Sequence, residues 1–260
     1  MVITSKDNDF IKHIKKLKEK KYRDEFGEFI VEGIKMIQEA IREHAKIKQI
    51  VICDDCKNEG AISQDELYDI AKYDCIYVTE KIFNLITDVV APQGIMAIVE
   101  KPIKSENKID YKAENFLILD NIQDPGNMGT ILRTADSLNM KQIIVSPGSA
   151  DCYNSKVVRS TMGAIFRVNV IERDLEKVIS EMKKREIKIY ATDLRTDKNI
   201  YNVNYEKSAV VIGNEANGVS DKVLQMADEK IKIPMLGKTE SLNAAVATGV
   251  LLYEIARRKM

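Results

Sequence analysis

Three loops in the second half of the chain hold the residues whose types and spacing could do chemistry. Each loop follows an apolar run that predicts a buried strand, and each combines glycine with amide, carboxylate or cationic side chains. Glycine lets the backbone approach a ligand closely, and free N–H groups at a helix start attract anions. Because open α/β sheets bind ligands beyond the carboxyl ends of their strands, the loops indicate a polar binding site.

The candidate residues are, in chain order, Asn127 and Arg133 within 120–133, Gly213 and Glu215 within 213–218, and Ser241 and Asn243 within 233–243. Each has a plainer interpretation. Asn127 could cap a helix with Arg133 on its surface, and Glu215 could face water. Ser241 could cap the last helix, but this does not explain Asn243, one turn inside an apolar helix. The second loop matches neither GxGxxG nor a Walker sequence, which weakens hydride transfer and ATP hydrolysis as functions.

Other residue types exclude further classes of site. The two histidines, His13 and His44, lie in the first fifth of the chain, so the second half has none for a Ser-His-Asp triad or a multi-histidine metal site. Cys53 and Cys56 form one CxxC without a second pair, which favours reduced cysteines at a strand end over a zinc or redox site. We therefore expect no metal.

Composition is that of a globular protein. The 260 residues include 40 basic and 40 acidic side chains, and 45% are hydrophobic. No apolar run approaches the roughly 20 residues of a membrane helix, and the lysine-rich first 21 residues lack a signal-peptide core. These features predict a cytoplasmic protein that does not enter a membrane.

Strands alternating with helices must position the three loops. In the first half, apolar patterns predict strands over 29–31, 49–52, 76–78 and 95–99 and helices over 32–44, 65–72 and 80–86. In the second half, they predict strands over 116–119, 143–145, 167–171, 187–191, 209–212 and 230–233 and helices over 127–138, 156–162, 175–185, 221–227 and 241–258. The pattern breaks over 101–114. We expect an α/β protein with domains at 1–105 and 115–260 and a linker at 106–114.

One segment is strongly basic although the net charge is zero. Residues 12–23 contain seven basic side chains and one acid, and Phe10, Ile14 and Leu17 recur at helical spacing. This predicts one amphipathic helix whose basic face binds a phosphate backbone, with an ordinary solvated face as the alternative.

Taken together, the three loops closely resemble the three motifs of the SpoU (TrmH) family of RNA ribose 2′-O-methyltransferases, in the SPOUT superfamily. The matching stretches are Asp124-Pro125-Gly126-Asn127-x-Gly129-x-x-x-Arg133, Gly213-Asn214-Glu215-x-x-Gly218 and Ile233-Pro234-Met235-x-Gly237-x-x-x-Ser241-Leu242-Asn243. Val157-Val158-Arg159-Ser160-x-Met162-Gly163-Ala164 also matches, and Phe29-Ile30-Val31-Glu32-Gly33 resembles the family's N-terminal domain. The resemblance covers nearly the whole chain.

The resemblance implies a fold, a cofactor and partners. The expected fold is an α/β SPOUT domain with a C-terminal trefoil knot, threaded by about 236–260, preceded by a small α/β RNA-binding domain that resembles a ribosomal protein. S-adenosylmethionine is the expected cofactor, and the matching positions are Thr192, Gly213, Ile233 and Leu242. The expected partners are RNA and a second copy of the chain, with the last helix and the first-motif helix near the dimer interface.

The implied chemistry is methyl transfer to a ribose 2′-hydroxyl. Family reasoning assigns removal of the hydroxyl proton to Arg133, helped by the phosphate of the target nucleotide. Because a neutral arginine costs about 9 kcal/mol at pH 7, we expect Arg133 to position the phosphate and the hydroxyl instead. Asn127, Glu215, Ser241 and Asn243 are expected to orient Arg133, the nucleotide and the cofactor.

Several alternatives remain for the substrate and the activity. A full N-terminal module favours ribosomal RNA, but such a module also suits transfer RNA or antibiotic-resistance methylation. A non-catalytic RNA-binding or ribosome-assembly factor would keep the fold without the reaction. An unrelated nucleotide-binding α/β enzyme would have an unknotted C-terminus.

Overall fold

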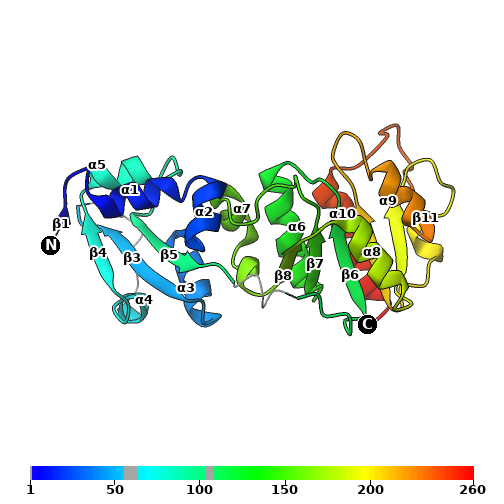
Figure 1. Ribbon diagram of the computed structural model, residues 1–260, viewed down its shortest axis with the longest axis horizontal. Helices are drawn as coiled ribbons and strands as arrows, with labels where there is room; N and C mark the ends of the chain where they lie inside the picture. The colour runs from blue at the N-terminus through cyan, green and yellow to red at the C-terminus, as the bar shows by residue number, and fades with distance from the viewer. Residues whose placement is uncertain (1, 56–63, 103–107) are drawn as a thin grey trace. The chain divides into compact units, whose positions relative to one another are not determined.

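The chain forms two compact units that are not contiguous in sequence. The computed structural model describes residues 2–55, 64–102 and 108–260 (Figure 1). Unit 1 consists of Met1–Ile103 and Tyr153–Phe166, and unit 2 of Lys104–Cys152 and Arg167–Met260. Both contain a sheet covered by helices, which confirms the predicted α/β class.

Unit 1 is built on a five-stranded mixed sheet in the order β1-β4-β3-β5-β2. Its strands are β1 (Val2–Ile3), β2 (Glu28–Glu32), β3 (Ile47–Cys53), β4 (Cys75–Val78) and β5 (Ile95–Glu100). Its helices are α1 (Asp9–Lys16), α2 (Lys20–Phe26), α3 (Ile34–Arg42), α4 (Gln64–Ile70), α5 (Glu80–Ile86) and α7 (Ser155–Thr161). Apolar side chains of α1 and α5 pack on β3, β4 and β5 to form its core.

The basic segment is two helices, so the prediction of one helix over 12–23 is wrong. Helix α1 ends at Lys16, and α2 begins at Lys20. Leu17, between them, is only 1% exposed because it completes the apolar face of α1 in the core. The buried guanidinium of Arg23 donates to the Leu17 carbonyl at 2.7 Å and stabilises the break.

The segment Tyr153–Phe166 packs inside unit 1, although in sequence it lies between two strands of unit 2. The Phe29 ring of β2 lies 4.9 Å from the Tyr153 ring and 6.3 Å from the Phe166 ring. Ser155 donates to Asp88 at 2.9 Å. Since β2 is an edge strand, this segment covers the apolar edge that the sheet would otherwise expose.

Unit 2 is built on a six-stranded, all-parallel sheet in the order β11-β9-β10-β6-β7-β8. Its strands are β6 (Asn115–Leu119), β7 (Gln142–Val145), β8 (Asn169–Glu172), β9 (Lys188–Thr192), β10 (Ser208–Ile212) and β11 (Glu229–Ile231). Its helices are α6 (Pro125–Ser137), α8 (Leu175–Lys183), α9 (Asp221–Met226) and α10 (Ala244–Arg257). Helices α8 and α9 share one core with alternate residues of β6, β9 and β10, and α6 packs against α10 (Figure 1).

Two of the three helices that follow candidate loops begin at other residues than predicted. Helix α6 begins at Pro125 and is capped by Asp124, whose carboxylate accepts from the Asn127 N–H at 2.7 Å. Asn243 caps α10, because its Oδ1 accepts from the N–H groups of Ala245 and Val246. Ser241 is therefore not the cap, and Asn243 lies at the helix start rather than one turn inside.

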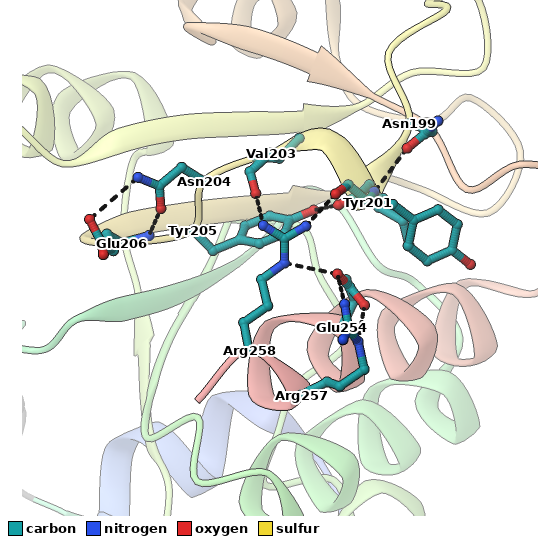
Figure 2. Close-up of polar contacts among 10 residues, drawn as sticks. Asn199, Tyr201, Val203, Asn204, Tyr205, Glu206, Glu254, Arg257 and Arg258 are labelled. Carbon is teal, nitrogen blue, oxygen red and sulfur yellow. Dashed lines mark hydrogen bonds and ion pairs between the residues drawn. The ribbon is translucent and has the colours of Figure 1, made fainter. Parts of the chain in front are cut away.

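The end of α10 is anchored to the loop before β10. Figure 2 shows the Arg258 guanidinium donating to the carbonyls of Tyr201 and Val203 and to the Glu254 carboxylate. Arg257 forms a two-point contact with Glu254 at 2.8 and 3.0 Å. Hydrogen bonding from Arg257 and then from Arg258 lowers the pKa of Glu254 to about 2. This ion-pair cluster keeps the last helix turn in place.

The predicted linker lies partly outside the described residues, at 106 and 107. Of the rest, Ile109, Tyr111 and Ala113 pack against the unit 2 core, and the Tyr111 hydroxyl donates to Glu181 at 2.8 Å. No helix in the described part of the chain is long and apolar enough to cross a membrane.

Candidate active site

The parallel sheet of unit 2 brings the candidate loops to one edge. Strands β6, β9, β10 and β11 all run in the same direction, so the loops that follow them share the carboxyl-end edge. A cavity of about 410 Å³ lies there. The four predicted cofactor residues, Thr192, Gly213, Ile233 and Leu242, all line it. Its other lining residues include Leu194, Met235, Ser241 and Ala244.

The loop after β10 requires glycine for steric reasons. Asn214 and Gly218 exchange two backbone hydrogen bonds of 2.9 Å, which fold residues 214–218 into a tight turn. A Cβ atom at Gly213 would lie 2.0 Å from the backbone of Gly218 and Val219, far inside van der Waals contact. Gly218 has φ +69°, a left-handed conformation that glycine adopts without strain. The turn therefore presents the backbone of Gly213 to the cavity.

A chain of hydrogen bonds joins the three motifs. The Asn243 side-chain amide donates to Asn127 Oδ1 at 2.9 Å, and Asn127 Nδ2 donates to the Glu215 carboxylate at 2.9 Å. The carboxylate also accepts from the backbone N–H groups of Gln123 and Asp124, both at 3.3 Å. Three predicted site residues from loops far apart in the sequence thus form one polar cluster.

Glu215 is held in its ionised form by this cluster. Partial burial alone would raise the pKa of its carboxyl group. The hydrogen bonds from Asn127 and from the Gln123 and Asp124 backbone more than offset burial, so the pKa lies below its usual value. A carboxylate with a lowered pKa and occupied lone pairs is a poor general base. Its geometry suits a brace between loops.

The remaining two predicted residues lie outside the cluster. Arg133 lies on α6 six residues after Asn127, so that the two side chains are separated by about 120° around the helix axis, and it is exposed. Within the described ranges it forms no hydrogen bond or ion pair, so its guanidinium is available to an anion. Ser241 is exposed at the rim of the cavity.

Sequence reasoning gave no role to two further polar residues that shape the same edge. Asn214 donates to the Asn121 carbonyl at 2.8 Å and accepts from the N–H groups of Ala216 and Asn217. Asp120, nearly buried, accepts from the Ser220 N–H at 2.8 Å. Both residues lie just after the end of a buried strand. A polar residue at that place in the sequence was the signal that could have identified them.

Sequence reasoning also missed two charged residues in the cavity wall. Arg195 makes a two-point contact with Asp193 at 2.9 and 3.1 Å, and this contact lowers the pKa of the Asp193 carboxyl.

In the parts of the chain that the structure describes, no group of three or more His, Cys, Asp or Glu side chains is placed to hold a metal ion. Cys53 of the CxxC is disulfide-bonded, so the expectation that it is reduced is wrong, and Cys56 lies outside these parts.

Two known families match the chain, one in its first half and one mostly in its second half. Residues 114–253 match the SpoU rRNA methylase family. Residues 8–97 match the MRM3-like substrate binding domain. The first match contains all nine predicted site residues.

Several rRNA methyltransferases are similar to this chain over nearly its full length. The chain is 34% identical over 254 residues to the 23S rRNA (guanosine(2553)-2'-O)-methyltransferase RlmP of Bacillus subtilis, covering 97% of this chain and 98% of that protein. It is 28% identical to the 23S rRNA (uridine(2479)-2'-O)-methyltransferase of Streptomyces viridochromogenes, covering 99% and 92%. The AdoMet-bound rRNA methyltransferase structure from Sinorhizobium meliloti superposes with a TM-score of 0.86 at 29% identity, covering 100% and 98%.

Proposed function

The chain belongs to the SpoU rRNA methylase family, and we propose that it methylates a ribose 2′-hydroxyl of ribosomal RNA with S-adenosylmethionine as methyl donor. Its fold is that of the SPOUT methyltransferases with an N-terminal substrate-binding domain. The C-terminal knot that the resemblance implies stays a prediction. Relatives that modify guanosine and uridine are both similar to it, so the target nucleotide is not assigned.

The cavity of unit 2 fits the cofactor in size and in lining. Its volume, about 410 Å³, lies in the range of about 300–1,000 Å³ that is typical of small-molecule sites. Apolar side chains such as Ile233 and Leu242 suit the adenine ring. The backbone of the turn that follows Gly213 can bind its polar edges, and so can the hydroxyl oxygen of Thr192, whose hydrogen is donated to the Val211 carbonyl. S-adenosylmethionine supplies an electrophilic methyl group on a positively charged sulfur.

The cluster of Asn127, Glu215 and Asn243 would hold the loops at the distance that methyl transfer requires. Because Glu215 is a weak base, we assign it to positioning and not to proton removal. Arg133 would bind the phosphate beside the target ribose and orient the 2′-hydroxyl, since a guanidinium donates to phosphate in a planar, two-point geometry. Ser241, at the cavity rim, would contact the nucleotide.

A homodimer is the oligomeric state that the surface of unit 2 supports. Val246 and Tyr253 are 53% and 56% exposed on α10, and they lie two helical turns apart on one face. Helix α6, which carries Arg133, packs beside α10. A two-fold contact through α10 would cover these apolar side chains and bring Arg133 close to the interface.

Unit 1 would bind the RNA. Its match to a substrate binding domain and the basic residues of α1 and α2 support this role. A ribosomal RNA substrate would place the protein in the cytoplasm.

The observation that supports this proposal most strongly is that residues of the second and third motifs line one cavity. Hydrogen bonds from Asn243 to Asn127 and from Asn127 to Glu215 join the first motif to the other two. The test is transfer of labelled methyl from S-adenosylmethionine to unmodified 23S rRNA transcribed in vitro, followed by mapping of the labelled nucleotide. We expect one labelled ribose in 23S rRNA and none in a transfer-RNA pool. Labelling of the transfer RNA alone would show that the assignment of ribosomal RNA as the substrate is wrong. Absence of turnover in a folded protein that binds RNA would favour an assembly factor.

A further inference from the structure

We propose that Tyr22 stacks on an unpaired base of the substrate RNA and that Lys16 and Lys21 hold the flanking phosphates. This inference rests on the proposed function and adds a base-recognising residue to unit 1.

Tyr22 lies on α2 where two lysines can reach its ring. The ammonium groups of Lys16 and Lys21 lie 5.5 and 5.4 Å from the ring centroid. A mobile ammonium reaches a ring only where the core does not cover it, so these contacts mark accessible aromatic surface. Tyr22 is half-buried, and both lysines are exposed.

The ring is supported from the protein side. Phe26 lies nearly parallel to Tyr22, with centroids 6.1 Å apart, and His13 packs 4.8 Å from Phe26. His13 is fixed in turn by a 2.6 Å contact with the nearly buried Glu28. An aromatic column that ends in Tyr22 restricts the ring to few orientations. It therefore costs less entropy to stack on a base.

The surrounding charge attracts a phosphate backbone. Residues 12–26 contain seven basic and three acidic side chains. Lys12 and Lys18 are paired with Asp9 and Asp88. Within the described residues, Lys16 and Lys21 have no carboxylate partner, and their charges rest on the Tyr22 ring. When the two ammonium groups move from the Tyr22 ring to phosphates, the face of the ring becomes free for a base. The lysine–phosphate contacts and the stacking contact can therefore form together.

A base is the occupant that this combination fits. Proteins that bind single-stranded nucleic acid pair a positively charged surface with aromatic rings on which bases stack. RNA-binding proteins recognise unpaired bases of loops and bulges in the same way. The relatives act on ribosomal RNA, in which such loops are abundant. An acidic protein partner would use the lysines but not the ring.

The chain has no tryptophan, so a single indole reports on this position. In the full-length Tyr22→Trp variant, saturating unmodified 23S rRNA should quench tryptophan fluorescence. A base that stacks on the indole ring deactivates the excited indole before it emits. The matched control is Tyr68→Trp. Tyr68 is 70% exposed with Lys72 at 4.4 Å from its ring, but it lies among Asp65 and Asp69. Its emission should not change.

Binding measurements separate stacking from charge. Tyr22→Leu should weaken binding of the rRNA about 5- to 150-fold, and Tyr22→Phe should stay within about twofold, because the phenyl ring still stacks. Lys16→Ala with Lys21→Ala should flatten the slope of log affinity against log salt by up to about 1.8 and leave the Tyr22→Trp quench in place at low salt.

An unquenched Tyr22→Trp protein, saturated with an rRNA that it still methylates, would overturn the inference and leave the proposed function intact. A wild-type protein that neither binds nor methylates rRNA would overturn both. If Tyr22→Leu and Tyr22→Phe weakened binding equally, the hydroxyl would be the recognition group and stacking would be wrong.

Discussion

At the scale of single residues, Glu215 has a geometric role. Its carboxylate accepts hydrogen bonds from Asn127, Gln123 and Asp124, which belong to the motif on the neighbouring strand. The lowered pKa follows from these donors, because they favour the charged form over the neutral one. The charged carboxylate thus connects the first and second motifs through hydrogen bonds.

The pH dependence of Glu215→Gln tests this role. Because the pKa is lower in the folded than in the unfolded protein, the carboxylate stabilises the fold above the unfolded value of about 4.3, and this contribution is lost as pH falls through the folded pKa. We expect the variant to be less stable than the wild type in urea at pH 7, with the difference shrinking below about pH 4. An equal difference at pH 7 and pH 3.5 would contradict a role for the charge.

Arg133 is the other residue whose role is specific. It is exposed and separate from the polar cluster, so Arg133→Ala should leave S-adenosylmethionine binding by calorimetry nearly unchanged. Methyl transfer should fall at least about a hundredfold, or about 2.7 kcal/mol of transition-state stabilisation. Arg133→Lys should not restore it, because an ammonium lacks the planar, two-point geometry. If Arg133→Lys kept most of the activity, a simple charge would be sufficient.

At the scale of elements, the crossover between β7 and β8 belongs to the other unit. These strands pair directly in unit 2, but the segment Tyr153–Phe166 that connects them covers β2 of unit 1. Phe29 of β2 is 1% exposed and lies against the Tyr153 ring. The region that matches the methylase family therefore contributes part of the core of unit 1.

Tyr153→Ala should accordingly loosen unit 1 and not unit 2. The loss of an aromatic pair and of the Lys101 ammonium over the Tyr153 ring at 4.6 Å should cost about 1–3 kcal/mol. Amide hydrogen exchange should accelerate in β2 and remain unchanged in β9 and β10. Faster exchange confined to β7 and β8 would show that the segment stabilises its own sheet instead.

At the scale of the whole molecule, assembly through α10 is the main expectation. Val246 and Tyr253 are large apolar side chains that water reaches in the single chain. Val246→Glu with Tyr253→Glu would place four carboxylates at a two-fold contact, so the mass by light scattering should fall from twice the 29.5 kDa chain mass to once that value. Leu85→Glu, at a 42% exposed side chain of α5, is the control and should stay dimeric. A wild-type monomer would disprove the dimer.

The sequence by itself determined the α/β class, the three motifs and the family, because these depend on local hydrophobic periodicity and on fixed spacing along the chain. Only the tertiary structure decided that Asn243 caps α10 and donates to Asn127, 116 positions away, since that contact requires the register of parallel strands. Burial of Leu17 likewise divided the basic segment into two helices that periodicity had joined. The packing of Tyr153–Phe166 against β2 could not be predicted from the sequence either. A local hydrophobic pattern does not specify the sheet against which a helix packs.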